Sequence, residues 1–125
     1  MPRLKTLLPA AILAATSAPS QAADWWLVSQ PGADRAALFA DVESLRRHDG
    51  RAELRTLRID RTGRSGERLE TIRCTGEQGR SDQAALHRFA CAPDGERDRY
   101  GLILAGMSPQ EAARLVFAQP RPPRS

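Results

Sequence analysis

The most informative segment of this sequence for the fold is Arg51-Ala52-Glu53-Leu54-Arg55-Thr56-Leu57-Arg58-Ile59-Asp60. Its first five residues alternate charged and apolar side chains, as a half-buried β-strand does. It follows His48-Asp49-Gly50, where Asp and Gly tolerate the backbone angles of a tight reversal. Between Leu54 and Leu57 the alternation slips by one residue before it resumes, which a β-bulge would explain. The stretch therefore predicts a strand that is entered through a tight turn and carries a bulge.

Four further segments have the composition or the alternation of strands. They are residues 25–28, 68–74, 84–91 and 100–104. Polar segments with Gly or Pro separate them at 29–32, 62–66, 75–82 and 93–98. In the third strand, alternation places His87, Phe89 and Cys91 on one side. We expect this strand to pair with residues 68–74 as a hairpin.

Residues 34–47 fit two structures. Leu38, Val42 and Leu45 are spaced at i, i+4 and i+7, which favours a helix with one apolar face. Residues 38–41 also fit a short strand that enters a turn. Taken from the residues alone, the choice between helix and strand stays open.

The clearest local signal is the start of a C-terminal helix. Ser108 can cap the first turn, Pro109 suits the first helical position, and Glu111 completes a capping box three residues after Ser108. Gln119-Pro120 ends the helix. Residues 120–125 form a tail of Pro, Arg and Ser that has nothing to bury, and we expect it to be disordered.

Residues 1–22 resemble an export signal. Two cations precede an apolar stretch at 7–15, and Ser20-Gln21-Ala22 supplies small residues for cleavage after Ala22. The apolar stretch is well short of the ~20 residues that span a bilayer, so no transmembrane segment is expected. Loss of Arg3 and Lys5 with the signal lowers the formal net charge of +4 by two. We expect one domain at 23–119, in the periplasm or secreted to the cell surface.

The two cysteines follow from this location. Cys74 and Cys91 are the only cysteines, and an oxidising compartment favours a disulfide between them. If the strands at 68–74 and 84–91 pair, both cysteines lie at corresponding ends. Closing a loop of this length stabilises a fold by ~3 kcal/mol. The alternative is a metal site with His87, which lacks a fourth ligand at a suitable spacing.

Candidate catalytic residues are few. Ser44, His48 and Asp49 could be combined into a triad, but they crowd a single turn, whereas triad members normally come from separate elements. His87 is the other candidate base. The sequence has no Gly-rich phosphate loop and no zinc-protease motif. We therefore expect no enzyme activity, no cofactor and no metal ion.

Arginines are concentrated between residues 46 and 68, and the candidate binding patch consists of Arg46, Arg47, Arg51 and Arg55. Such a patch could bind acidic ligands or anionic surfaces. Acidic residues interrupt the run, among them Asp49, Glu53, Asp60 and Glu67. These charges could equally be ordinary solvated pairs across a sheet.

Several of these features together resemble the surface-adhesin protein E family of exported bacterial proteins. They are Trp26 on a leading strand, the string at 38–50 with Asp41-x-x-Ser44, the cysteine pair and the short C-terminal helix. The resemblance implies an α+β fold in which an antiparallel sheet of about five or six strands packs against helix, with one disulfide in the later part. It also implies that residues 38–41 form a strand that leads into one helical turn through Leu45. Adhesins of this type bind host matrix proteins such as laminin and vitronectin and can dimerise.

Three hypotheses for function result. The first is an exported, non-catalytic binding or adhesion domain of the bacterial envelope, as a monomer or homodimer, whose partner is a protein or envelope polymer and not a nucleic acid. The second is a small periplasmic enzyme that uses His87 or the turn with Ser44 and His48. The third is an arginine-rich protein that binds anionic surfaces.

Overall fold

The stretch that alternates at 51–60 forms β4 (Arg51–Ile59), the strand around which the sheet is built. The structure is a computed structural model that describes residues 23–29, 36–75 and 81–119. The expected export signal at 1–22 and the tail at 120–125 lie outside the described residues, as do residues 76–80 of the loop expected at 75–82.

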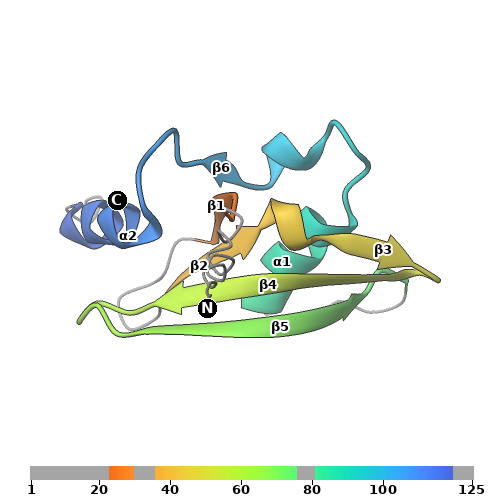
Figure 1. The fold of residues 1–125 in the computed structure, drawn as a ribbon, viewed down its shortest axis with the longest axis horizontal. Helices are drawn as coiled ribbons and strands as arrows, with labels where there is room; N and C mark the ends of the chain where they lie inside the picture. Colours follow the sequence, from red (N-terminus) through yellow and green to blue (C-terminus); the bar gives the residue numbers. More distant parts are fainter. Residues whose placement is uncertain (1–22, 30–35, 76–80, 120–125) are drawn as a thin grey trace, which may run out of the picture.

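The sheet is antiparallel and, within the described residues, has six strands. One edge of β4 pairs along its whole length with β5 (Ser65–Arg73). Its other edge is shared between β3 (Arg46–His48) and β2 (Ala37–Asp41). The sheet continues from β2 through β1 (Trp25–Ser29) to β6 (Leu102–Ile103), as Figure 1 shows. The last strand is thus shorter than the expected 100–104.

The β-bulge predicted in β4 is wrong. The register between β4 and β5 runs without a break from Arg51 opposite Arg73 to Ile59 opposite Ser65. The apolar pattern slips because the covered side changes along the strand: Leu54 packs in one core and Leu57 in the other, on the opposite side. The irregular register lies instead between β1 and β2.

The segment after β1 confirms the strand and turn that the resemblance implies. Residues 37–41 form β2, and η2 (Val42–Ser44), a single 3₁₀ turn, follows directly. All five residues of β2 are buried. Leu38 and Ala40 belong to one core, and Ala37 and Phe39 to the other, so the strand is apolar on both sides. The helical spacing of Leu38, Val42 and Leu45 arises because Val42 and Leu45, in and after the 3₁₀ turn, pack against the same core as Leu38.

The strand predicted at 84–91 is wrong, because these residues belong to α1 (Ser81–Cys91). The wholly buried residues are Leu86, Phe89 and Ala90, spaced at i, i+3 and i+4 as on one face of a helix. His87 therefore lies on the helix and not on a strand. In a short segment the alternation of residues 87, 89 and 91 is compatible with both structures, and packing against the sheet selects the helix.

The two helices cover opposite sides of the sheet. The α1-side core combines Leu86, Phe89 and Ala90 with residues of β2 and β4, and Trp26 meets the Phe89 ring edge-on with centroids 5.7 Å apart. The α2-side core combines Ala112 and Ala113 of α2 (Pro109–Ala118) with Leu27, Ala37, Phe39, Leu57 and Ile59.

The connection between the helices approaches the α1-side core closely. It includes η3 (Arg97–Arg99) and passes through Gly101 into β6. A Cβ atom at Gly101 would lie only 2.6 Å from Cε1 of Phe89. Glycine at this position is what allows the chain to cross the Phe89 ring.

The predicted capping box of the C-terminal helix is confirmed. The Ser108 hydroxyl accepts from the Glu111 amide at 3.1 Å, and the Glu111 carboxylate accepts from the Ser108 amide at 2.9 Å. The bond from the Ser108 amide holds the pKa of Glu111 below its ordinary value. The helix begins where the local sequence places it.

Candidate functional site

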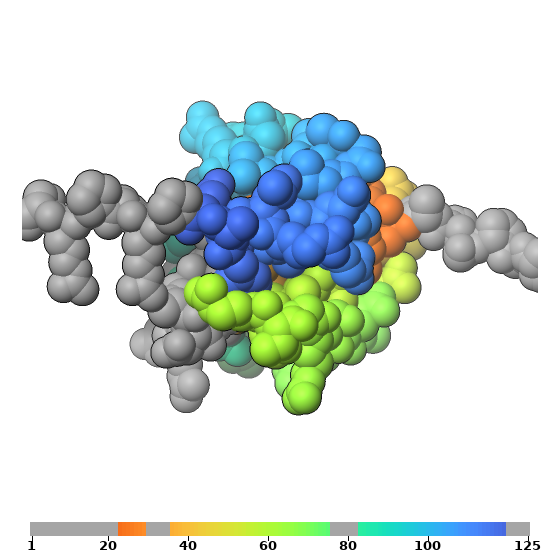
Figure 2. All heavy atoms as spheres, turned by 90° about the vertical axis from the view of Figure 1, so that its left-hand side faces the viewer, coloured from red at the N-terminus to blue at the C-terminus, as the bar shows by residue number. Residues whose placement is uncertain are grey.

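The α2 side of the sheet is covered at one end only. Figure 1 shows α2 beside the end of β4 at which the hairpin turns into β5, while β3 lies at the opposite end. Figure 2 looks onto the covered end, where α2 (dark blue) lies against the tip of the hairpin (green). The β3 end of the same side has no helix among the described residues over it.

The strand register identifies the side chains on this uncovered part, because residues directly opposite each other in a sheet project to the same side. One cross-strand row contains Arg46, Glu53 and Thr71, and the next contains His48, Arg51 and Arg73. We call the exposed side chains of this region the open face; it consists of Arg46, His48, Arg51, Glu53, Arg55, Glu67, Leu69, Thr71 and Arg73. Leu69, at 64% exposure, is the apolar side chain of this face.

At the border of the open face lies a fully buried carboxylate, that of Asp41. Its Oδ1 accepts from the amides of Asp24, at 2.8 Å, and Glu43, at 3.0 Å. Its Oδ2 accepts from the Arg55 guanidinium at 2.8 Å. Arg55 therefore has a structural partner, and a second carboxylate, Glu67, lies 3.8 Å from it.

Ser44 completes this arrangement through the backbone. Its hydroxyl donates to the Asp41 carbonyl at 2.8 Å and accepts from the Arg55 amide at 2.8 Å. The Asp-x-x-Ser segment thus joins the end of β2 to the middle of β4. Both hydrogen bonds of Ser44 are made with backbone groups, so the residue has a structural role in this turn.

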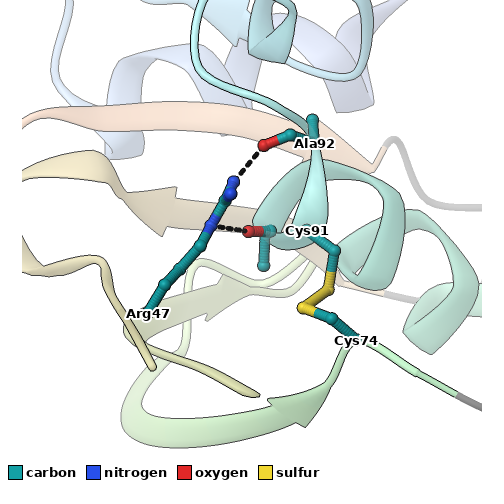
Figure 3. Close-up of a disulfide and its surroundings, with 5 residues drawn as sticks. Arg47, Cys74, Cys91 and Ala92 are labelled. Atoms are coloured by element: carbon teal, nitrogen blue, oxygen red, sulfur yellow. Dashed lines mark hydrogen bonds between the residues drawn. A yellow bond between two sulfur atoms is a disulfide. The ribbon is translucent and has the colours of Figure 1, made fainter. Parts of the chain in front are cut away.

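Arg47 lies apart from the other arginines of the predicted patch. It is opposite Ala52, which faces the α1-side core. Its Nε donates to the Ala90 carbonyl at 3.1 Å, and its terminal nitrogen donates to the Ala92 carbonyl, as Figure 3 shows. These carbonyls lie at the C-terminal end of α1, where backbone acceptors lack partners within the helix and favour a cation.

The structure therefore brings together three of the four patch residues, Arg46, Arg51 and Arg55, and separates the fourth. It adds Arg73, which sequence reasoning missed. Arg73 is 22 positions after Arg51 in the chain, yet the two are directly opposite in the β4–β5 pair. The alternation of β4 and β5 about one hairpin could have indicated the pairing, but only a known register places the two arginines side by side.

The predicted disulfide is confirmed, with Cα atoms 5.5 Å apart. Figure 3 shows that it does not join two strands: Cys91 is the last residue of α1, and Cys74 follows β5. The Cys74 amide also donates to the Gly50 carbonyl at 2.8 Å. Because both sulfurs are bonded to each other, neither is available as a thiolate ligand for a metal ion.

The two histidines lie in different surroundings. His48 is exposed, with Nδ1 3.8 Å from the Asp49 carboxylate. His87 has both ring nitrogens buried, and neither has a hydrogen-bond partner among the described residues. In the described part of the chain, no group of three or more His, Cys, Asp or Glu side chains could hold a metal ion.

A second surface feature is a hollow of about 380 Å³ between α1 and the segment before β6. Its lining includes Arg88, Asp98, Arg99 and Tyr100. The floor is apolar, with Leu27 and Val28. Arg88, Asp98 and Arg99 around the hollow are exposed, so it combines polar and apolar groups as ordinary protein surface does.

The hairpin at the covered end is stabilised by Asp60. Its carboxylate accepts from the Thr62 hydroxyl at 2.7 Å and from the amides of Thr62 and Arg64. The hydrogen bond from the Thr62 hydroxyl is the main reason that the pKa of Asp60 lies below its ordinary value. This well-defined turn keeps β4 and β5 in register up to the open face.

Comparison of the chain with models of protein families, with curated proteins and with solved structures found no match. No helix within residues 23–29, 36–75 and 81–119 is long and apolar enough to cross a membrane.

Proposed function

We propose that this chain is an exported, non-catalytic binding domain of the bacterial envelope, related to the surface-adhesin protein E family, and that the open face is its binding surface. The observation that carries the proposal is the uneven covering of the sheet. At the β3 end of the sheet, α1 covers one side, whereas the other side presents charged side chains and Leu69 on strands with a continuous register. An exposed surface of this kind, with no cavity among its side chains in the described part of the chain, suits a macromolecular partner better than a small substrate.

Two further observations support the proposal. The hydroxyl of Ser44, the candidate nucleophile, is bonded to two backbone groups, and the nearest partner of His48 is the exposed Asp49. The disulfide is compatible with the oxidising compartment that the leader at 1–22 implies. A domain of the periplasm or cell surface, beginning after Ala22, accounts for both.

The binding surface can be tested with a pair of tryptophan substitutions. Thr71→Trp places a bulky neutral side chain in the middle of the open face, and Gln110→Trp places the same side chain on the exposed part of α2. The mature protein is immobilised and exposed to envelope extract, with and without added host matrix proteins. We expect a specific partner that Thr71→Trp releases and Gln110→Trp retains.

Equal retention of every captured partner by both variants would contradict the choice of surface.

The enzymatic alternative has its own test, the double substitution of His48 and His87 by Ala. A hydrolytic activity of the mature protein that disappears in this variant would contradict the non-catalytic proposal.

A further inference from the structure

We infer that the open face binds an anionic polysaccharide, and that Arg51 and Arg73 form the centre of this site. The inference rests on the proposed function, since it names the class of partner for the same surface. It starts from the row of His48, Arg51 and Arg73, in which three potential cations from three adjacent strands stand side by side. Neighbouring strands are ~4.8 Å apart, so the two guanidinium groups are close neighbours.

This row destabilises the folded protein when no ligand is bound, because like charges directly opposite each other destabilise a strand pair. Neither Arg51 nor Arg73 makes an ion pair or side-chain hydrogen bond with another described residue. The other arginines of β4 differ: Arg55 is paired with Asp41, and Arg58 lies 2.9 Å from the Glu70 carboxylate. An anionic group between Arg51 and Arg73 would remove the repulsion and accept hydrogen bonds from both.

The adjacent row indicates what kind of anion fits. It contains Arg46, Glu53 and Thr71, which lie two residues farther along each strand, ~7 Å from the first row. Guanidinium groups bind sulfate or carboxylate groups through paired hydrogen bonds. Glu53 and Thr71 can exchange hydrogen bonds with hydroxyl groups. Anionic groups that alternate with hydroxyls are the chemistry of a charged polysaccharide.

Two other polyanions fit this surface less well. The open face carries no Trp, Tyr or Phe, so it offers no platform on which the bases of a single-stranded nucleic acid could stack. The helix α2 stands on the same side of the sheet, and a helix with its side chains is ~10 Å thick. Because α2 projects above the open face, it would hold a flat bilayer away from Arg51 and Arg73. A single polysaccharide chain, in contrast, can lie along the strands beside α2.

The test uses heparin as the probe and two double variants of the mature protein. Arg51→Ser with Arg73→Ser removes the central pair. Arg68→Ser with Arg114→Ser removes the same charge from exposed positions off the open face, on the other side of β5 and on α2. We expect the first variant to bind heparin at least tenfold more weakly, and the control to change affinity by less than a factor of three. Thermal unfolding should show that the first variant is as stable as the native protein, because a like-charge pair has been removed.

Equal weakening by both double variants would overturn the inference, since binding would then depend on net charge alone. Absence of heparin binding by the native protein, or tighter binding to phosphatidylglycerol vesicles or to single-stranded DNA, would overturn it as well. The proposed function fails separately, when Thr71→Trp leaves every captured partner bound. A partner that is released by Thr71→Trp but retained by the Arg51 and Arg73 double variant supports the binding surface and contradicts the polysaccharide.

Discussion

The two sides of the sheet are built differently. On the α1 side, the helix ends at a disulfide to Cys74, the residue that follows β5. Arg47 donates to carbonyls at the end of this helix, and Phe89 is wholly buried. On the α2 side, the helix has no covalent link to the sheet and contributes two small buried residues, Ala112 and Ala113. At the β3 end of the sheet, the side with the crosslink and the cap is covered by α1, and the opposite side is exposed.

Because of this difference, we expect the residues that stabilise the domain and the residues that bind a partner to lie on opposite sides of the sheet. The packing of α1 and the continuous pairing register hold the strands together, so the open face on the other side keeps its arrangement without a helix above it. A small domain has little apolar surface to bury, which makes a crosslink on one side valuable. Substitutions on the α1 side should therefore affect stability most, and substitutions on the open face should affect binding.

The largest effect is expected from Phe89→Ala. Removal of a wholly buried ring leaves a cavity between α1 and the sheet, and such substitutions cost about 3–5 kcal/mol of unfolding free energy. The matched change on the α2 side, Phe117→Ala, removes a partly buried ring and should cost about 1 kcal/mol. Urea unfolding of both variants measures the difference. Equal losses would mean that the two cores contribute equally.

The disulfide should come next. Replacing Cys74 and Cys91 by Ser should lower the unfolding free energy by ~3 kcal/mol, because the unfolded chain regains the freedom of a loop that spans 17 positions. Hydrogen exchange of the variant should rise more in α1 than in α2. Thiol titration of the native protein is the control, and two free thiols would contradict the crosslink.

Arg47 and Arg46 are neighbours on β3 that project to opposite sides. Arg47→Gln loses two charged hydrogen bonds to carbonyls at the end of α1 and should cost about 2 kcal/mol. Among the described residues, Arg46 donates to the carbonyls of Glu43 and Leu45 in its own exposed turn, so Arg46→Gln should stay within about 0.5 kcal/mol. Thermal unfolding measures both variants. A larger loss for Arg46 would reverse the assignment of sides.

The smallest effect concerns the start of α2. Ser108→Ala removes the hydrogen bond from the Glu111 amide to the Ser108 hydroxyl and should cost about 1 kcal/mol of unfolding free energy.

The other hydrogen bond of the capping box, from the Ser108 amide to the Glu111 carboxylate, depends on pH. The pKa of Glu111 is lowered in the folded protein, so the stabilisation by this carboxylate is complete above the ordinary glutamate pKa and is lost as the pH falls through the lowered value. The stability of Glu111→Gln should therefore approach that of the native protein in acid. A difference that does not change with pH would contradict the charged cap.

Local signals explain which elements could be predicted. The turn at Asp49-Gly50, with positive φ at both residues, leads into β4 as the sequence indicates, and Ser108 begins α2. The strand at 84–91 was wrong because a short alternating segment is compatible with a helix, and contacts with distant strands decide between them. The bulge was wrong because an apolar slip can also mean that the covered side changes along a regular strand.

The candidate site was predictable only in part. Arg51 and Arg55 lie four positions apart on β4, so their common side follows from the period of a strand. Arg46 lies on β3 and shares this side because the tight turn places it opposite Glu53. Arg73 and Arg47 needed the register and the position of α1, which no local pattern contains. The function of the Asp41 carboxylate is likewise invisible in the sequence, since its partners Asp24 and Arg55 come from distant segments.

The disulfide between the two cysteines and the capped C-terminal helix could be predicted from the residues themselves, because the first depends on composition and the second on residues within a few positions. The antiparallel α+β arrangement was what the resemblance implied, and the structure confirms that arrangement. Three features could be learned only from the folded chain: residues 81–91 are helical, α1 and α2 cover opposite sides of the sheet, and Arg51 lies opposite Arg73. These features depend on which segments pair and what covers them. The free energy of such contacts arises between residues far apart in the chain, where local periodicity carries no information.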